Sequence, residues 1–340
     1  MTRVAINGFG RIGRNFFRAY LERKPGFEVV AVNDLGDPKT MAHLLAYDSL
    51  LGPLAEQVDT DGETIVVGAR RLRALSIPDP ADLPWRDLEI DVVVESTGRF
   101  EHRDKAQAHL DAGAHTVLVS AVAKDADVMI VLGVNDDAYD QAHHRIVSMA
   151  SCTTNCVTPM AKVLQDRFGI ERGFMTTVHA YTATQALLDG PHKDLRRARA
   201  AAINLIPTTT GATRALGAVL PELEGKIDAL AIRAPVPVGS IVDLVAELSR
   251  TADRDEVNAA FSEAAATPPL AGILEYSEQP LVSTDILRSP YSCIFDSQLT
   301  MTSGRLAKVF GWYDNEWGYS CRLVDLVAKI AETMPAAVAA

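Results

Sequence analysis

The sequence predicts a two-domain chain: an α/β domain with a doubly wound parallel sheet, then an α+β domain with a mainly antiparallel sheet. Its 340 residues suit two domains at roughly 100–200 residues each. The first half alternates Val/Ile/Leu-rich runs with helical segments, and continuous apolar runs are typical of parallel strands buried on both faces. Beyond residue 150, long strands follow one another with fewer helices, which favours an antiparallel sheet.

The first half reads as repeated strand–helix–strand units. Strand-like runs bracket two helical segments, and the spacing suits parallel strands joined by crossover helices. We expect strands at 3–8, 28–34, 91–98 and 116–120, with helices at 11–22 and 103–114.

The second half of the chain has a different pattern of expected elements. A helix with a Thr-rich opening is expected at 207–223 and an acid-started helix at 253–265, with strands at 226–235, 239–250 and 305–314. Between them, residues 181–210 form a basic, poorly periodic stretch. A loop of this length in a compact protein is usually functional.

Composition excludes several classes of partner. The net charge of -11 and the pI near 5.2 argue against nucleic acid or anionic membrane. No apolar run approaches the roughly 18 residues that span a bilayer, and the first residues lack the pattern of an export signal. Four cysteines in a chain this long are no disulfide framework, so we expect a reducing cytoplasm.

A dinucleotide fingerprint follows the first strand. Gly8 suits the tight turn, Gly10 lets the backbone approach a pyrophosphate, and Gly13 lets helix and strand pack closely. The amides of Arg11 and Ile12 then face the phosphates from a helix N-terminus. The alternative is that these glycines only shape a turn, but the flanking strand and helix favour a Rossmann dinucleotide site.

Asp34 ends the second strand at the distance the fingerprint expects. A carboxylate there accepts a hydrogen bond from a ribose 2′-hydroxyl and repels a 2′-phosphate, which favours NAD over NADP. The alternative is a solvated turn residue.

The stretch "ASCTTNC" contains Cys152 and Cys156, four residues apart. Zinc binding lacks two further ligands with paired spacing, and a disulfide is not expected in the cytosol. Packing suits Cys156, one helical turn from Cys152. Cys152 lies where a strand gives way to a helix, where free amides and the helix dipole favour a reactive thiolate. We therefore predict that Cys152 is a nucleophile.

A cysteine nucleophile needs a base, and His179 is the best candidate. It ends the strand-like run "MTTVHA", whereas most other histidines lie in charged helical or loop contexts. A packed or capping histidine is the alternative at this point.

Six motifs together resemble one family. In order they are "INGFGRIGRN", "ASCTTNC", "MTTVHAYTATQ", "DLRRARAA", "PTTTGA" and "YDNEWGYS". This set, from Arg3 to about Ala331, is similar to phosphorylating glyceraldehyde-3-phosphate dehydrogenase.

The resemblance implies a catalytic scheme. The Cys152 thiolate attacks the aldehyde of glyceraldehyde 3-phosphate, His179 acts as base, and inorganic phosphate releases the thioester as 1,3-bisphosphoglycerate. It also implies two anion sites. The substrate phosphate is assigned to Thr182 and Arg233, and the attacking phosphate to Ser151, Thr153, Arg197, Thr210 and Gly211.

For the cofactor the resemblance adds Ser120 and Asn315 to Gly8, Gly10, Arg11, Ile12 and Asp34. It implies an NAD-binding domain over 1–150 and a catalytic domain over 151–315, with a helix near 316–334 returning to the first domain. A homotetramer is implied, with the 181–210 loop between subunits. No metal is expected.

The sequence departs from the family pattern at five positions: Pro78, Val122, Met149, Val236 and Val238. These changes affect the pocket and the adenine region and remove no catalytic group. NADP stays as the alternative cofactor. The alternative functions are erythrose-4-phosphate dehydrogenase and a non-catalytic NAD-binding protein.

Overall fold

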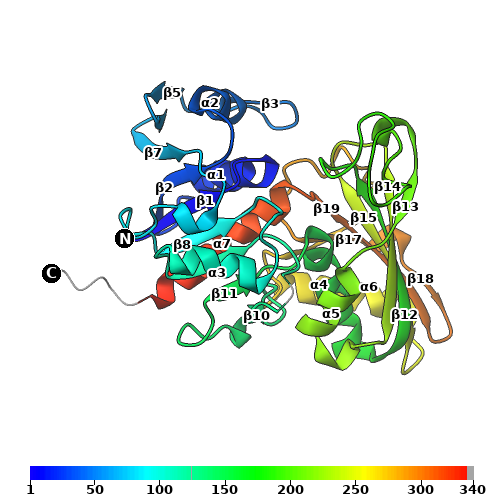
Figure 1. Ribbon diagram of the computed structural model, residues 1–340. Coiled ribbons are helices and arrows are strands. Elements are labelled where there is room, and N and C mark those ends of the chain that lie inside the picture. Colours follow the sequence, from blue (N-terminus) through cyan, green and yellow to red (C-terminus); the bar gives the residue numbers. More distant parts are fainter. Residues whose placement is uncertain (124, 335–340) are drawn as a thin grey trace. The chain divides into compact units, whose positions relative to one another are not determined.

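A computed structural model describes residues 1–123 and 125–334, which divide into two compact units (Figure 1). Unit 1 comprises the described residues of Met1–Ile130, Asp137–Ala150 and Ser320–Ala340, and unit 2 comprises Val131–Asp136 and Ser151–Tyr319. The predicted fold class is confirmed, because unit 1 has a mostly parallel sheet and unit 2 a mixed, mainly antiparallel one.

Unit 1 is built on a sheet of strand order β10-β11-β9-β8-β1-β2-β7-β6-β5. The strands from β10 to β7 run parallel, and β6 and β5 extend the sheet as an antiparallel edge. A separate short hairpin pairs β3 with β4. The strands are β1 (Thr2–Asn7), β2 (Phe27–Asn33), β3 (Tyr47–Asp48), β4 (Gly52–Pro53), β5 (Val58–Asp61), β6 (Thr64–Val67), β7 (Arg70–Leu75), β8 (Val92–Glu95), β9 (Thr116–Val119), β10 (Val128–Met129) and β11 (Ile146–Ser148).

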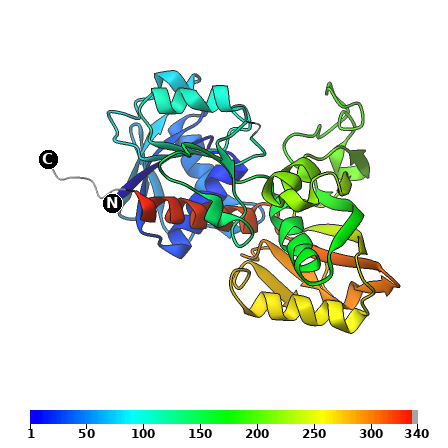
Figure 2. The same cartoon turned by 90° about the horizontal axis from the view of Figure 1, so that it is seen from below.

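Helices of unit 1 connect and cover these strands (Figure 2). They are α1 (Arg11–Arg23), α2 (Pro38–Ala46), α3 (Arg103–Asp111) and most of α7 (Trp317–Thr333), with 3₁₀ turns at Pro80–Asp82 and Asp136–Ala138. An ion pair of 2.6 Å between Arg23 and Asp325 links α1 to the C-terminal part of α7. The last helix therefore packs with the first residues of the chain.

Unit 2 has the strand order β13-β14-β12-β15-β19-β17-β16, with β18 beside β19. The predicted strands are all present, yet β12 pairs parallel with β14 because the chain crosses over through α5 before β14 begins. The strands are β12 (Ile170–Ala180), β13 (Ile206–Thr208), β14 (Ile227–Ala234), β15 (Ser240–Leu248), β16 (Leu274–Ser277), β17 (Cys293–Asp296), β18 (Met301–Ser303) and β19 (Leu306–Tyr313).

Three helices pack against one face of this sheet (Figures 1 and 2). They are α4 (Cys152–Phe168), α5 (Ala212–Val219) and α6 (Arg254–Ala266), with 3₁₀ turns at Ala201–Ile203, Pro221–Leu223 and Ser297–Leu299. The helix expected at 207–223 is shorter than predicted, and the poorly periodic stretch ends earlier. The reason is that Ile206–Thr208 pairs with β14, which leaves only the segment after Gly211 for α5.

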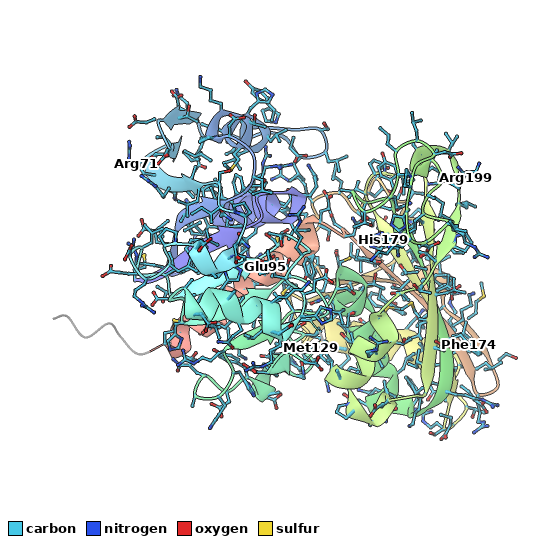
Figure 3. All side chains as sticks on the ribbon, viewed as in Figure 1. Arg71, Glu95, Met129, Phe174, His179 and Arg199 are labelled. Atoms are coloured by element: carbon cyan, nitrogen blue, oxygen red, sulfur yellow. The ribbon has the colours of Figure 1, made fainter. Side chains whose placement is uncertain are left out.

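The outer face of this sheet carries exposed apolar side chains. Phe174 on β12, Leu230 on β14 and Leu306 on β19 are solvent-exposed, and Figure 3 labels Phe174. Among the described residues, no helix combines the length and apolar character needed to cross a bilayer.

Candidate active site

The carboxyl ends of β1, β2 and β8 enclose a cavity of about 250 Å³ in unit 1. Its lining is contributed by the residues that end these strands and by two neighbouring loops: Asn7, Gly8, Gly10, Asn33, Asp34, Leu35, Ile77, Pro78, Ser96, Thr97, Arg99 and Phe100. A crevice at this edge of a doubly wound sheet is the usual place for a nucleotide.

The three fingerprint glycines have the geometry that a dinucleotide requires. Gly8 has φ +93°, and a Cβ there would meet the backbone nitrogen of Thr97 at 2.6 Å. A Cβ on Gly13 would lie 2.1 Å from the Gly8 carbonyl oxygen, so only glycine lets α1 come this close to the turn. A Cβ on Gly10 would meet no atom within 4 Å. The backbone at Gly10 therefore faces open space at the start of α1.

Asp34 lies on the wall of this cavity. Its Oδ2 accepts a hydrogen bond of 2.7 Å from the Phe9 amide, which fixes the carboxylate beside the turn. Pro78 lines the same cavity, so the departure at that position does reach the nucleotide region.

The Arg11 side chain is engaged within the protein. Its guanidinium pairs with Asp48, whose carboxylate also accepts from the amides of Leu50 and Leu51. Burial alone would raise the pKa of Asp48, but these amides and Arg11 together lower it. The Arg11 side chain therefore secures the loop after α2.

A dinucleotide fits these residues: the backbone at Gly10 is open, α1 begins beside it, and a carboxylate stands at the end of β2. Ser120, by contrast, is not among the cavity-lining residues. Its amide donates to the Glu95 carbonyl at 2.9 Å, at the end of β9.

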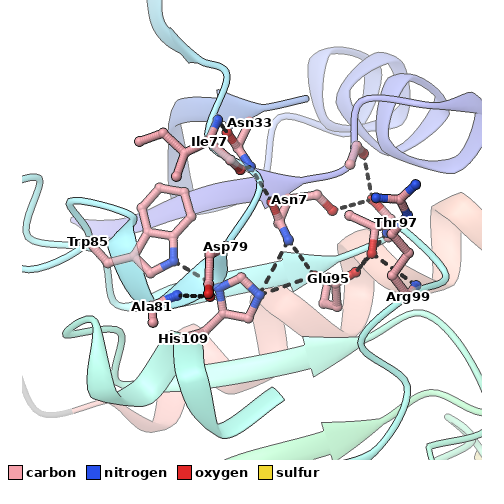
Figure 4. A network of polar contacts seen from close by, with 12 residues as sticks. Asn7, Asn33, Ile77, Asp79, Ala81, Trp85, Glu95, Thr97, Arg99 and His109 are labelled. Atoms are coloured by element: carbon pink, nitrogen blue, oxygen red, sulfur yellow. Dashed lines mark hydrogen bonds and ion pairs between the residues drawn. The ribbon is translucent and has the colours of Figure 1, made fainter. Parts of the chain in front are cut away.

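Beneath the cavity lies a buried polar network that the sequence did not indicate (Figure 4). Asn7, Glu95, His109 and Trp85 are linked in a chain of hydrogen bonds within the core of unit 1. The one sequence signal for this network is that Asn7 and Glu95 are polar residues at the ends of apolar strands.

In unit 2, Cys152 is the first residue of α4. Ser151 is the N-cap, and its Oγ accepts from the Thr154 amide at 3.1 Å. The helix therefore begins at the predicted position, with the thiol on its first turn.

The structure brings Cys152 and His179 together. The distance from Cys152 Sγ to His179 Nε2 is 3.4 Å, and His179 is buried at the end of β12. His179 Nδ1 lies 2.7 Å from the Ala180 carbonyl oxygen, which only accepts hydrogen bonds. In the tautomer that donates from Nδ1 to Ala180, Nε2 has a free lone pair directed at the thiol. This arrangement suits a base.

Arg233 is the third member of the cluster. The parallel register places Arg233 on β14 directly beside His179 on β12. Arg233 Nη1 donates to the Ala180 carbonyl oxygen at 3.1 Å, so this oxygen accepts from both side chains, whose Nη1 and Nδ1 atoms lie 2.8 Å apart. Burial, followed by the positive charge of Arg233, lowers the pKa of His179 to about 3. The imidazole is therefore neutral near pH 7.

Opposing effects act on the Cys152 thiol. Burial raises its pKa, whereas Arg233 and the Thr153 amide lower it, and burial is the largest of these effects. The lowering by the amide is the effect expected at a helix N-terminus, and the opposing loss of solvent around the sulfur could not be judged from the sequence.

Two hydroxyl groups that the resemblance assigns to phosphate binding form hydrogen bonds within the protein. Thr153 Oγ1 lies 2.9 Å from the Tyr313 hydroxyl, which also lies 2.9 Å from Thr177 Oγ1. Ser151 Oγ caps α4. No sequence pattern singled out Tyr313, the first residue of "YDNEWGYS", whose ring meets the His179 ring edge-on with 5.8 Å between the ring centres.

Arg197 approaches the cluster from the 181–210 loop. Its Nε donates to Thr208 Oγ1 at 2.9 Å, and its charge contributes to the lowered pKa values of His179 and Arg233. Thr210 Oγ1 accepts from the Ala212 amide at 3.2 Å, and Gly211 immediately precedes α5.

Thr182 follows the end of β12, and its Oγ1 lies 2.9 Å from Thr184 Oγ1. Asn315 is buried in unit 2, where its Oδ1 accepts from Ser240 Oγ at 3.0 Å. Ser240 Oγ in turn accepts from the Ala180 amide, so Asn315 is tied to the strand end that carries His179.

The remaining thiols are structural. Cys156 is buried with its Sγ 3.5 Å from the Gly311 carbonyl, and all four cysteines are free. Among the described residues, no group of three or more His, Cys, Asp or Glu side chains gathers as a metal site would require.

Two further departures from the family pattern lie in unit 2. Val238 is buried, and the backbone carbonyl of Val236 accepts a hydrogen bond from the Tyr181 amide. Met149 is buried, its amide donates to the Val119 carbonyl, and nothing in the structure explains the methionine side chain.

A doubly wound nucleotide domain joined to a domain in which a half-buried cysteine contacts a buried histidine defines a class: a nucleotide-dependent dehydrogenase with a thiol nucleophile. Comparison with known proteins agrees. Residues 2–103 match the NAD binding domain of glyceraldehyde 3-phosphate dehydrogenase, and residues 151–315 match the C-terminal domain of the same enzyme.

Curated relatives match almost the whole chain. The glyceraldehyde-3-phosphate dehydrogenase of Streptomyces coelicolor is 58% identical over 333 residues, covering 98% of this chain and 99% of the relative. That of Mycobacterium avium is 58% identical over 339 residues, with the same coverage. The chain therefore belongs to the glyceraldehyde-3-phosphate dehydrogenase family. The predicted family, enzyme class and NAD-binding domain are confirmed.

Two glycine variants separate folding from nucleotide binding. Gly10→Ala adds a Cβ into open space, so the melting temperature should hardly change while NAD affinity falls, because the methyl group blocks the backbone approach. Gly13→Ala pushes a Cβ against the Gly8 carbonyl and should cost about 1–3 kcal/mol of stability. Thermal unfolding and calorimetric titration with NAD measure both. Unchanged NAD affinity in Gly10→Ala would contradict the assignment of the cavity.

Proposed function

We propose that this protein catalyses the NAD-dependent oxidative phosphorylation of D-glyceraldehyde 3-phosphate to 1,3-bisphosphoglycerate. The observation that carries the mechanism is the contact of 3.4 Å between Cys152 Sγ and His179 Nε2. A sulfur nucleophile beside a neutral imidazole is the arrangement that covalent catalysis on an aldehyde requires.

In the first step, His179 Nε2 takes the Cys152 thiol proton as the sulfur attacks the aldehyde carbon. A carbon–sulfur bond forms, the carbonyl π bond opens, and the oxygen receives the thiol proton back from His179 to give a hemithioacetal. The proposed NAD site would supply the acceptor for the hydride that leaves this carbon. His179 takes the hydroxyl proton in the same stage, which leaves a thioester on Cys152.

In the last step, inorganic phosphate attacks the thioester carbonyl carbon. The carbon–sulfur bond breaks, the acyl phosphate leaves, and Cys152 is released as a thiolate. The lowered pKa of His179 keeps the imidazole neutral, so a lone pair is available for the proton transfers. Bound phosphate groups offset the positive charges of Arg233 and Arg197, which raises the basicity of His179 when substrate is present.

Unsatisfied donors support the substrate phosphate site. Arg233 Nε and Gln185 Nε2 are buried and have no hydrogen-bond partner among the described residues. Gln185 also accepts from the Thr182 amide, which places that donor at the predicted threonine. We assign this phosphate to Arg233 and Thr182, because a guanidinium binds phosphate oxygens through several N–H groups.

We assign the attacking phosphate to Arg197, Thr210 and Gly211. Ser151 and Thr153 remain proposed members of this site through their backbone amides, since their hydroxyls have internal partners. For NAD we propose Gly8, Gly10, Arg11, Ile12 and Asp34, with Ser120 and Asn315 retained from the resemblance.

Erythrose-4-phosphate dehydrogenase is not favoured, because the curated relatives described above carry the triose name. The intact contact between Cys152 and His179 argues against a non-catalytic nucleotide-binding protein. A free catalytic thiol needs a reducing compartment, and the four cysteines are unpaired, so we propose the cytoplasm.

Phosphate dependence tests the reaction. NADH formation from glyceraldehyde 3-phosphate should require inorganic phosphate, and Cys152→Ser should abolish it. Phosphate-independent turnover of erythrose 4-phosphate would identify the other enzyme instead.

Replacing the base should slow chemistry more than binding. His179→Gln should lower kcat by about 10²–10⁴-fold with little change in KM for the aldehyde, because the proton acceptor is lost while the arginines remain. Steady-state kinetics measure this. His143→Gln, at an exposed position of unit 1, is the control. Equal kcat values for His179→Gln and the control would contradict the assignment of the base.

Cofactor preference depends on Asp34. Asp34→Asn keeps an oxygen for the Phe9 amide and removes the negative charge, so the kcat/KM ratio of NADP to NAD should rise about tenfold. Asp37→Asn, which keeps the cap of α2, should leave the ratio unchanged. A ratio unaffected by Asp34→Asn would show that another group selects the cofactor.

We also propose that the chain forms a homotetramer in which the 181–210 loop lies between subunits. This loop exposes Leu187, Leu188, Leu195, Ile203 and Leu205, each between 67% and 81% accessible. Phe174, Leu230 and Leu306 on the sheet of the same unit are also exposed, and clustered exposed apolar side chains mark interaction surfaces.

Light scattering after size exclusion tests this assembly. The native protein should have four times the 36.7 kDa mass of one chain, and Leu187→Glu with Leu195→Glu should give smaller particles. Leu44→Glu, an exposed leucine of unit 1, should leave the mass unchanged. A monomeric native protein would overturn the proposal.

A further inference from the structure

The buried polar network under the dinucleotide cavity centres on Glu95 (Figure 4). The Glu95 side chain is 1% exposed and that of His109 is fully buried. Within the described part of the chain, no Arg or Lys side chain pairs with Glu95. A buried carboxylate is costly unless its oxygens are fully hydrogen-bonded.

Four donors meet this carboxylate. Oε1 accepts from the Thr97 amide at 2.7 Å and also from the Thr97 hydroxyl. Oε2 accepts from Asn7 Nδ2 at 2.6 Å and lies 3.1 Å from His109 Nε2. Each carboxylate oxygen therefore accepts from two groups. Both donors to Oε1 belong to Thr97 in the cavity wall, and the donors to Oε2 belong to Asn7 and His109.

The direction of every hydrogen bond is fixed from the histidine end. Trp85 Nε1 can only donate, and it lies 2.9 Å from His109 Nδ1. Nδ1 must therefore accept, which places the ring proton on Nε2, facing Glu95.

The direction is also fixed from the opposite end. The Ile77 amide donates to Asn33 Oδ1, so the Asn33 Nδ2 group donates to Asn7 Oδ1 at 2.7 Å. Asn7 then has only its Nδ2 group left to face Glu95. Both ends of the network thus direct donors at Oε2, and only an acceptor fits there.

The groups held by Glu95 shape the cavity. Asn7, Asn33 and Thr97 all line it, and Thr97 Oγ1 accepts from the Arg99 amide at 3.1 Å, which continues the wall. The backbone at Thr97 also approaches Gly8 so closely that no Cβ fits between them.

We propose that Glu95, oriented by His109, is a positioning residue of the dinucleotide site. Its carboxylate holds the side chain of Asn7 and the backbone of Thr97 in place, and these two residues line the cavity in which the cofactor binds. This rests on the proposed NAD site. The catalytic pair lies in unit 2, so loss of this position affects cofactor binding rather than chemistry.

Glu95→Gln is the direct test, because it keeps the shape and places an NH₂ group opposite fixed donors. Calorimetric titration of nucleotide-free protein with NAD should show Kd raised about tenfold or more. KM for NAD should rise in parallel, while kcat at saturating NAD stays within about twofold of the native value.

Trp85→Phe is the matched control for a merely structural role. It removes a buried donor of the same network and leaves the donors to Glu95 in place, so it should lower the melting temperature with Kd changed less than about twofold. If Trp85→Phe and Glu95→Gln lowered stability and NAD affinity to the same extent, the role would be structural and the proposal overturned.

Thr97→Val provides a second readout that does not depend on Glu95→Gln folding. It removes one donor to the carboxylate and should weaken NAD binding less than Glu95→Gln does. If Glu95 acts through Thr97, the double variant should bind NAD about as weakly as Glu95→Gln alone. Fully additive effects, or native affinity in Thr97→Val, would contradict the proposal. Failure of the native protein to bind NAD would instead overturn the proposed cofactor site.

Discussion

The catalytic centre depends on the parallel pairing of β12 with β14. This register places Arg233 beside His179, and the N-terminus of α4 brings Cys152 to the opposite side of the ring. Among the described residues, no carboxylate forms a salt bridge with Arg233. The half-buried positive charge of Arg233 disfavours protonation of the imidazole, and we propose that it also attracts the substrate phosphate.

The same contact links stability to pH. The folded chain holds His179 with a pKa of about 3, whereas the unfolded chain has the ordinary value of 6.5. Between these values the unfolded state binds one more proton, so the free energy of unfolding falls as pH decreases through this range. Above pH 6.5 His179 is neutral in both the folded and the unfolded state, so the free energy of unfolding no longer depends on pH through this group. A buried base thus makes the protein sensitive to acid before its carboxylates are protonated.

Local patterns predicted much of the fold and the positions of the main groups. Apolar runs located the parallel strands, and the change from strand to helix located Cys152. The roles of Tyr313 and Glu95 could not be predicted from local patterns, because they depend on residues in other elements. Tyr313 contacts Thr153 on a helix, and Glu95 on a strand contacts His109 on a helix. The balance of effects on the pKa of Cys152 could not be predicted for a related reason, since the solvent around the sulfur is a property of the assembled unit.

The motif residues divide into those that bind ligands and those that hold the binding groups in place. Arg11 pairs with Asp48, Ser151 caps α4 and Thr153 bonds to Tyr313. These three side chains are satisfied internally. Among the groups that remain for ligands are the open backbone at Gly10 and the Nε of Arg233, which has no hydrogen-bond partner among the described residues. Fixed donors lose little entropy when an anion binds, so internal hydrogen bonds that appear to compete with the ligand instead prepare the site for it.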